Sequence, residues 1–282
     1  MSANRKLVTW TLSVTVAALI VGAARPPEVR GQDFLLKYDD EMTVTTYYST
    51  GGLSDQSHVI LAPGGWVWDI YAEDSSRVDV SGGAISYHHT YDTSTTNVNS
   101  GEIKYRVFSY HSSVINVFDG YVNDINAYAS SRINVSGGEV PGVSAYQSSR
   151  VEVTDGTVTT LSGYATSAIT VRGGTMNRLY ARESGTMDIY GAAFNELRAY
   201  DTSIVTFHAL DFDLGDGLTL DGERILGTGI LSGHWFDGTP WSVDVHWQEP
   251  DAQILAVPEP ATLALLAVGL SAVFIRRRRL SS

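Results

Sequence analysis

Residues 131–140 read SRINVSGGEV, and 18 positions later residues 149–158 read SRVEVTDGTV. Each stretch contains an apolar–polar–apolar triplet, and a glycine (Gly138 or Gly156) follows three residues after it. Alternation at period two predicts a strand with one buried face and one solvated face. The glycine supplies a position without a Cβ where the chain turns sharply. The two stretches therefore predict one repeated unit of strand, turn, short strand and turn.

The same unit recurs along most of the chain. One apolar column, which we call the anchor column, returns every 18 or 19 positions. It consists of Val80, Val98, Val117, Val135, Val153, Val171, Ile189 and Phe207. A glycine column follows three residues later, at Gly83, Gly101, Gly120, Gly138, Gly156 and Gly174. A fixed period of this kind indicates a repeat architecture.

A single repeat cannot be stable alone. Burying its few apolar side chains contributes roughly 6 to 15 kcal/mol, whereas ordering its residues costs about 27 kcal/mol. The difference must come from strand hydrogen bonds and core contacts that are shared with neighbouring repeats. The sequence therefore predicts an all-β fold, a parallel β-solenoid (β-helix) with coils of about 18 residues.

The period also sets the expected boundaries. Residues 59–212 are predicted to form about eight or nine coils. The apolar and glycine positions of the first, weaker coil are Ile60, Ala62, Gly65 and Val67. Residues 25–58 are expected to be an N-terminal cap and residues 213–248 a C-terminal β cap, because open ends expose core and unpaired strand edges. Residues 249–257 are predicted to be a linker.

Both ends of the chain carry membrane-handling patterns. Residues 1–24 have a basic start, an apolar run and then small residues, the order of a secretory signal peptide with its signal helix. An uncleaved anchor is the alternative. Residues 258–279 contain a Pro-Glu-Pro triplet, an apolar stretch over residues 261–275 and four arginines. As a helix that stretch is about 22 Å long, a marginal transmembrane span. The arginines favour a cytoplasmic C-terminal end, which leaves the preceding residues exported.

This three-part tail resembles the PEP-CTERM sorting signal of Gram-negative bacteria, and the repeat body is similar to autotransporter-like solenoids. The sorting residues would be Pro258, Glu259, Pro260, Arg276, Arg277, Arg278 and Arg279. The resemblance implies an inner-membrane exosortase as processing partner, an inner-membrane anchor before cleavage near the triplet, and an association with exopolysaccharide production. A plain C-terminal anchor is the alternative. The tail indicates where the protein is sorted and how it is processed, and it gives no information about the chemistry of the repeat body.

Composition excludes several classes of function. The chain has 31 acidic against 19 basic residues, a formal net charge of −12, and no cysteine. Nucleic-acid binding is disfavoured because phosphate contacts require clustered Lys and Arg. Thiolate metal sites and cysteine nucleophiles are excluded. The sequence contains no phosphate loop and no dinucleotide fingerprint, so no cofactor is expected.

Parallel β-helices include polysaccharide lyases and hydrolases, so the carboxylates are candidate catalytic groups. Asp119 and Asp155 share one column two coils apart. That places them about 10 Å apart, at or beyond the roughly 5 to 9.5 Å of a glycosidase pair. Asp79, Glu152 and Asp188 share another column, and Glu152 with Asp155 is a pair that geometry allows within one coil. Because Asp beside Gly is ordinary turn chemistry, structural roles are favoured.

The basic and imidazole side chains also have structural interpretations. Arg77, Arg132 and Arg150 share a column. A solvated ladder of ion pairs is favoured there over a clamp for sugar or phosphate. Because successive strand residues point to opposite faces, the adjacent His88 and His89 are not expected to hold one metal ion.

A tyrosine column lies beside a second expected bend. Paired hydroxyl residues, such as Ser130-Ser131 and Ser148-Ser149, predict that bend. The tyrosines are Tyr91, Tyr110, Tyr128, Tyr146, Tyr164 and Tyr200, and the column is interrupted by Glu73 and Arg182. Exposed rings could contact successive sugar rings, whereas inward rings would fill the corner of the solenoid. The packing role is favoured, and glycan contact is the alternative.

These observations favour an exported, non-enzymatic β-solenoid of the cell envelope or extracellular matrix, with a structural or adhesive role. The alternatives are a carbohydrate-active enzyme, a polysaccharide lyase or hydrolase, and a glycan-binding module acting on exopolysaccharide. An enzyme would require several acids and an Arg or His to converge in one groove.

Overall fold

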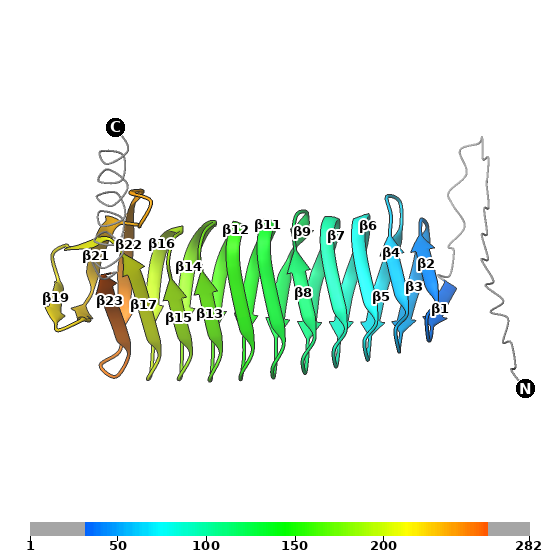
Figure 1. The fold of residues 1–282 in the computed structure, drawn as a ribbon, viewed down its shortest axis with the longest axis horizontal. Helices are drawn as coiled ribbons and strands as arrows, with labels where there is room; N and C mark the ends of the chain where they lie inside the picture. The colour runs from blue at the N-terminus through cyan, green and yellow to red at the C-terminus, as the bar shows by residue number, and fades with distance from the viewer. Residues whose placement is uncertain (1–31, 259–282) are drawn as a thin grey trace, which may run out of the picture. The chain divides into compact units, whose positions relative to one another are not determined.

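The computed structural model describes residues 32–258, and all 23 regular elements there are β-strands (Figure 1). Successive coils stack through parallel strand pairing, so the predicted all-β parallel solenoid is confirmed. The predicted signal helix of residues 1–24 and the predicted transmembrane helix of residues 261–275 lie outside the described residues. Within residues 32–258, no helix has the length and apolar character that crossing a membrane requires.

The strands form two parallel ladders. The first ladder contains β2 (Glu41–Val44), β4 (His58–Leu61), β8 (Val114–Val117), β13 (Ala168–Val171), β15 (Thr186–Ile189), β17 (Ile204–Ala209) and β23 (Gln253–Pro258). The second contains β1 (Gln32–Leu36), β3 (Tyr47–Leu53), β5 (Trp66–Ala72), β9 (Tyr121–Val122), β10 (Asp124–Ala127), β14 (Thr175–Ala181), β16 (Ala193–Ala199) and β22 (Pro240–Gln248). Four long strands bend from the first ladder into the second: β6 (Arg77–Thr90), β7 (Thr95–Ser109), β11 (Arg132–Ala145) and β12 (Arg150–Gly163).

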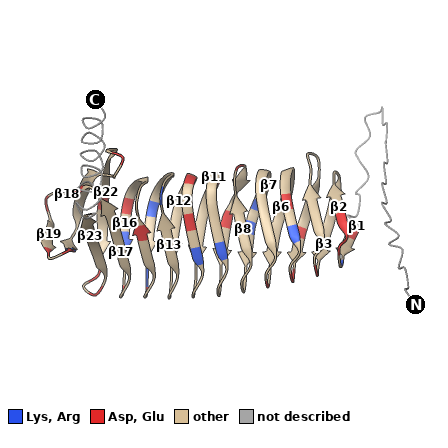
Figure 2. Ribbon diagram, in the orientation of Figure 1, with Lys and Arg blue, Asp and Glu red and all other residues tan. Residues whose placement is uncertain are grey.

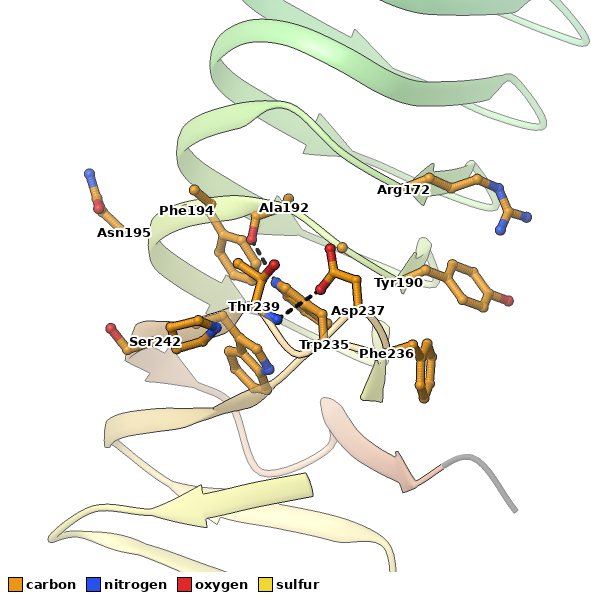
Figure 3. Close-up of a pocket in the computed structure, with 14 residues that line it drawn as sticks. Arg172, Tyr190, Ala192, Phe194, Asn195, Trp235, Phe236, Asp237, Thr239 and Ser242 are labelled. Carbon is orange, nitrogen blue, oxygen red and sulfur yellow. Dashed lines mark hydrogen bonds between the residues drawn. The ribbon is translucent and has the colours of Figure 1, made fainter. Parts of the chain in front are cut away.

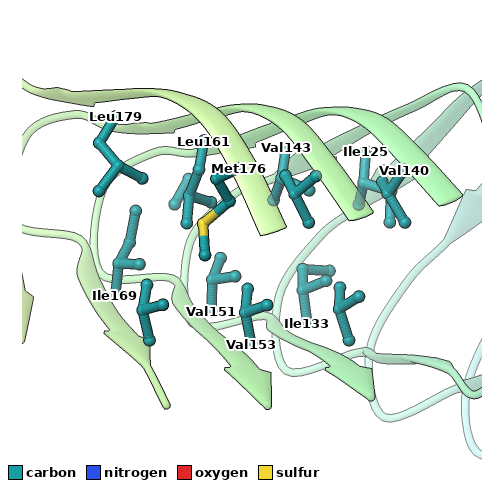
Figure 4. Packing of buried hydrophobic residues seen from close by; sticks show 14 of the residues in the cluster. Ile125, Ile133, Val140, Val143, Val151, Val153, Leu161, Ile169, Met176 and Leu179 are labelled. Carbon is teal, nitrogen blue, oxygen red and sulfur yellow. The ribbon is translucent and has the colours of Figure 1, made fainter. Parts of the chain in front are cut away.

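The core lies between the two ladders. Neighbouring residues of the anchor column are register partners, as Val135 is with Val153, and all eight are at most 1% exposed. Figure 4 shows first-ladder side chains such as Ile133 facing second-ladder side chains such as Val140. Because every coil repeats this contact, one continuous apolar core runs through the stack, as the alternating pattern predicted.

The glycine turn is required by two constraints at once. Gly138 has a φ of 73°, in the left-handed region that L-residues rarely adopt. A Cβ at Gly138 would lie 2.6 Å from the carbonyl oxygen of Gly120 in the preceding coil. Any side chain there would therefore force adjacent coils apart.

The opposite corner is the second bend that the hydroxyl pairs predicted. Each corner contains one non-glycine residue with φ between 53° and 60°, as at Ala129 and Gln147. In most pairs the first hydroxyl connects coils, as where the Ser148 Oγ donates to the Ala129 carbonyl at 2.9 Å. The second hydroxyl is buried. Ser131 and Ser149 are 0% exposed, and their Oγ atoms have no hydrogen-bond partner among the described residues.

The coils begin earlier than predicted. β1 pairs in parallel with β3, and β2 with β4, so residues 32–58 of the expected cap already belong to the solenoid. For the first, weaker coil, the predicted register was wrong by one residue in strand β4. Val59 and Leu61, not Ile60 and Ala62, pair with the core residues Val78 and Val80. A shift of one residue exchanges the faces of a strand, and this coil has 19 residues between its anchor positions.

The C-terminal end differs from the rest of the solenoid. It adds four strands that pair antiparallel: β18 (Asp211–Leu214), β19 (Leu218–Asp221), β20 (Arg224–Gly227) and β21 (Gly229–His234). The chain then returns to the stack, because β22 pairs in parallel with β16 and β23 with β17. The prediction of a linker at residues 249–257 was therefore wrong, because most of that segment is strand β23.

Candidate functional site

The six tyrosines of the predicted column lie on the outer side of the corner. Tyr91, Tyr110, Tyr128, Tyr146 and Tyr164 form a stack with ring centroids 4.7 to 5.1 Å apart and ring planes within 12° of parallel. All six rings are half-buried. The inward orientation that the sequence favoured is wrong, because small buried residues such as Ala127 and Ala145 already fill the inside of the corner. We call this stack, together with Arg182 and Tyr200, the tyrosine ladder.

Arg182 continues the ladder where a tyrosine is missing. Its guanidinium carbon lies 5.7 Å from the ring centroid of Tyr164 and 4.6 Å from that of Tyr200. A planar guanidinium can lie over an aromatic face as another ring would. The interruption seen in the sequence is therefore bridged by a cation–π contact on each side.

Stacking leaves the ladder with few free ring faces. Each inner ring has a neighbouring ring on both faces, so its edge and its phenol hydroxyl are what it presents outward. Burial, with a smaller effect of neighbouring phenols, raises the pKa of Tyr91 and Tyr128, so both remain neutral. Because a sugar stacks on the open face of a ring, the ladder is a poor platform for successive sugars.

A second group of aromatic residues has a different geometry. Tyr47, Trp66, Trp68, Tyr87 and Tyr105, from β3, β5, β6 and β7, make consecutive ring contacts with centroids 5.1 to 6.4 Å apart. Four of these five contacts are tilted or edge-on, with interplanar angles of 44° to 69°. Trp68 is 39% and Tyr105 45% exposed. We call these five residues the aromatic platform.

The sequence reasoning missed the platform because its residues do not recur in one column. Trp66 has Ala84 as its register partner, and a register shift in β7 accommodates Tyr105 as an additional residue. A usable signal was present, since Trp66 and Trp68 flank Val67 in an alternating strand and therefore share the face opposite to the core.

Polar side chains surround the platform. Lys104 Nζ lies 4.6 Å from the Trp66 ring centroid and 3.9 Å from a Glu102 carboxylate oxygen. Asp69 is half-buried, pairs in register with Tyr87, and makes no side-chain hydrogen bond with any described residue. Burial raises the pKa of Asp69, and the nearby His89 partly opposes this shift.

Asp79, one of the candidate acids, is saturated with donors. Arg77 Nε and His58 Nε2 lie 2.9 Å from its carboxylate oxygens, and the Asn97 amide donates to it at 2.8 Å. Burial alone would raise the pKa of Asp79, but these hydrogen bonds together hold that pKa below its ordinary value. Asn116 donates to Asn97 at 2.8 Å, so Asp79 terminates an amide ladder between coils.

The other candidate acids are dispersed among local contacts. Asp119 and Asp155 each accept the backbone N–H of the next glycine at 2.7 Å, the turn chemistry predicted for them. Glu152 pairs with Arg172 at 3.3 Å, and Asp188 accepts from His208 at 3.2 Å. Of the three column arginines, Arg77 pairs with Asp79, whereas Arg132 and Arg150 are exposed and form no ion pair with any residue in 32–258.

Figure 2 shows acidic and basic residues distributed over many coils. The structure therefore does not bring the candidate acids and arginines together into one groove.

The two adjacent histidines point to opposite faces, as expected. His88 is 0% exposed, and its Nε2 lies 2.5 Å from the Thr96 hydroxyl. Burial, with a smaller effect of His89, lowers the pKa of His88 to about 3, so this imidazole is neutral. His89 stacks outside between Tyr71 and Phe108. Across residues 32–258, no three His, Asp or Glu side chains are grouped to hold a metal ion.

A pocket of about 530 Å³ lies between the last coils and the C-terminal strands (Figure 3). Its lining includes Arg172, Tyr190, Asn195 and Phe236. Trp235 donates from Nε1 to the Ala192 carbonyl at 3.1 Å, and Asp237 accepts the Thr239 N–H at 2.8 Å. That backbone hydrogen bond holds the pKa of Asp237 below its usual value. Asp237 is the one carboxylate among the described residues that line the pocket, so these residues do not form the carboxylate pair that glycoside hydrolysis uses.

A family model described as the PEP-CTERM protein-sorting motif matches residues 256–279. Pro258 of the triplet is the last residue of β23. The remaining sorting residues, Glu259, Pro260, Arg276, Arg277, Arg278 and Arg279, lie outside the described residues. Comparison with curated proteins and comparison with solved structures each find no match. The chain therefore carries a PEP-CTERM sorting motif behind a parallel β-solenoid, which marks it as an exported protein and a substrate of an exosortase-type processing enzyme.

Proposed function

We propose that this protein is a non-enzymatic structural or adhesive element of the cell envelope or extracellular matrix. It is anchored in the inner membrane before processing and then reaches the cell surface or the matrix. The observation that supports this role most directly is the use of polar side chains to connect coils, from the Asp79–Asn97–Asn116 amide ladder to the Ser148 contact with Ala129. Such contacts favour an elongated, stable scaffold.

The distribution of carboxylates supports the non-enzymatic part of the proposal. A glycosidase needs one carboxyl with a raised pKa and a second one beside it. Asp79 has a lowered pKa and several donors, and Glu152 is paired with Arg172. A carbohydrate-active enzyme is therefore the less favoured function.

Incubation with bacterial polysaccharides tests the absence of activity. The full chain, purified in detergent, is mixed with each polysaccharide, and product release is measured as new reducing ends and as a loss of polymer length. We expect no shortening of any polymer. Polymer shortening that disappears in Glu152→Gln or Asp155→Asn would show that the protein is an enzyme.

Deletion of the gene tests the structural or adhesive role. We expect deletion cells to attach less to surfaces or to shed matrix more readily, and we expect the wild-type chain to restore both properties. A chain carrying both Glu152→Gln and Asp155→Asn should restore them equally. Unchanged attachment and unchanged matrix cohesion in the deletion strain would contradict the role.

A further inference from the structure

We propose that the aromatic platform binds a neutral polysaccharide chain on the outer face of the second ladder. This inference extends the proposed adhesive function by naming its ligand class, and it assigns the contact to Trp68, Tyr105 and Asp69 rather than to the tyrosine ladder. Three independent features of the platform lead to it: exposed rings that are not stacked in parallel on Trp68, an unused hydrogen-bond acceptor and internally balanced charge.

The first feature is the orientation of the rings. Trp68 contacts Trp66, Tyr87 and Tyr105 at interplanar angles of 44°, 63° and 62°, so none of these neighbours stacks on it in parallel. With 39% of its surface exposed, Trp68 presents apolar area that a sugar ring can cover. A pyranose has an apolar face of C–H groups and a polar rim, which matches an aromatic ring that has polar neighbours.

The second feature is Asp69. Strict alternation is interrupted here, because Trp68 and Asp69 both lie outside the core between the buried Val67 and Ile70. The Asp69 side chain makes no hydrogen bond within the described part of the chain. A carboxylate with two free acceptor oxygens can accept hydroxyl protons from a sugar. Because Asp69 is half-buried, a hydrogen bond made there is less exposed to competing water than one at a fully exposed side chain.

The third feature is the charge around the rings. Arg106 pairs with Asp124 at 2.8 Å, and Lys104 lies between Glu102 and the Trp66 ring. The nearby cations are therefore already matched by carboxylates of the same coil, as for Lys104, or of the next coil, as for Arg106. An acidic polymer would meet no free cation in this group and would meet the carboxylate of Asp69, so the platform fits an uncharged chain.

The same charged groups argue against a second protein as the occupant. The core of a protein–protein interface is depleted in Lys, Glu and Asp, and a stable interface buries about 800 Å² on each partner. Lys104 lies over the Trp66 ring with Glu102 beside it, and Asp69 follows Trp68 in the same strand, so a protein partner would have to desolvate these charges. Sugar hydroxyls can instead hydrogen-bond to these groups.

Binding to defined oligosaccharides and polysaccharides tests the proposal. The full chain in detergent is titrated with cellohexaose, laminarin and dextran as neutral probes and with alginate as an acidic probe. Tryptophan fluorescence and retention on the immobilised polymer are measured. We expect saturable binding to at least one neutral probe and weaker or no binding to alginate. We expect Trp68→Ala and Tyr105→Ala to weaken that binding at least tenfold, and Asp69→Asn to weaken it severalfold.

Trp247→Ala is the matched control. Trp247 is 51% exposed and lies in β22, a second-ladder strand far along the stack from β5. Its replacement should leave affinity unchanged, as should Tyr128→Ala within the tyrosine ladder. Circular dichroism of every variant checks that the β-fold is retained.

Three outcomes would overturn the proposal. The first is binding to none of the neutral probes, and the second is tighter binding to alginate. The third is that Trp68→Ala binds the polysaccharide with the same affinity as wild type. If light scattering instead showed self-association that depends on Trp68, the occupant of the platform would be a second copy of the chain. This proposal can fail while the proposed adhesive or scaffold role holds. If the Trp68→Ala chain fully restored the deletion strain, the platform would not be needed for that role, but the role itself would be supported.

Discussion

The tyrosine ladder and the aromatic platform are both exterior aromatic groups, yet they are organised differently. In the ladder, one residue type recurs at nearly every coil, so each ring lies over the next at 4.7 to 5.1 Å. In the platform, no single column supplies all five rings, and four of the five ring contacts are angled, whereas Tyr87 and Tyr105 stack. The first arrangement uses ring faces for cohesion between coils, and the second leaves them available to another molecule.

The difference shows that both the repeat period of a side chain and its exposure are needed to judge whether it is available to a ligand. A side chain repeated every 18 residues finds its own copy one coil away, and stacking consumes its surface. Where the repeat is broken, as by the additional residue in β7, the ring contacts are mixed: Tyr105 stacks on Tyr87 of the preceding coil but meets Trp68 edge-on. In a solenoid, breaks in the pattern are therefore better pointers to binding surfaces than the pattern itself.

Lowering the pH should change the free energy of unfolding more than any of the substitutions below. The group responsible, His88, lies in the core beneath the platform rather than beneath the ladder. His88 occupies a core column otherwise filled by residues such as Ile70, Val107 and Ile125. Its pKa is about 3 when folded and about 6.5 when unfolded. Between these values the unfolded chain binds the proton and the folded chain does not. Stability is therefore complete above pH 6.5 and falls by about 1.4 kcal/mol per pH unit below it.

Urea unfolding between pH 7 and pH 5 measures this dependence. His88→Leu combined with Thr96→Val should flatten it, because the double change removes the buried imidazole and its hydroxyl partner together. His111→Ala, at a side chain that is 63% exposed, should leave it intact. The same pH slope in the double variant and in wild type would exclude His88 as its source.

The second largest effect should be the difference in stability loss when one ring is removed from the ladder or from the platform. Tyr128→Ala removes stacking on both faces, and each aromatic contact contributes about 0.5 to 1.5 kcal/mol beyond buried area. We expect the free energy of unfolding to fall by about 2 to 3 kcal/mol. Trp68→Ala removes three ring contacts, but these are angled and the side chain is 39% exposed, so we expect a smaller loss of about 1 to 2 kcal/mol. Denaturant unfolding at pH 7 measures both, and a larger loss for Trp68→Ala would reverse the assignment of roles.

The smallest expected effect concerns the bridge in the ladder. Arg182→Ala should lower the free energy of unfolding by about 1 kcal/mol, since it removes cation–π contacts with Tyr164 and Tyr200. Arg182→Tyr should restore that loss by continuing the stack. Thermal unfolding of the three proteins gives the comparison. If the tyrosine variant proved as unstable as the alanine variant, the bridge would not depend on a planar group.

Most of the fold could be read from the sequence because the core of each coil is local and repeated. The anchor column and the glycine turn obey strand and turn chemistry that needs no knowledge of distant contacts. The beginning of the solenoid was missed because residues 32–58 fill the same positions with a different spacing, which moves Ile60 outward and Leu61 inward. Strand β23 was missed because its partner β17 lies about 50 residues earlier in the sequence.

The candidate site was less predictable for a different reason. Alternation shows which face a residue occupies, but not whether the neighbouring coil covers it. The tyrosines were identified correctly as a column and assigned the wrong side, because the size of Ala127 and Ala145 inside the corner was not considered. The platform depends on contacts among Trp66, Trp68 and Tyr105 that arise only when coils of 18 and 19 residues lie side by side.

Strand β23 runs to Pro258, the first residue of the sorting triplet. A protease that cuts immediately after this strand would meet a backbone already fixed by pairing with Ala209 of β17. The severed product would keep every strand of the stack from β1 to β23. Release from the membrane would then leave the ladders of residues 32–258 whole, because the cut falls beyond the last strand rather than within one.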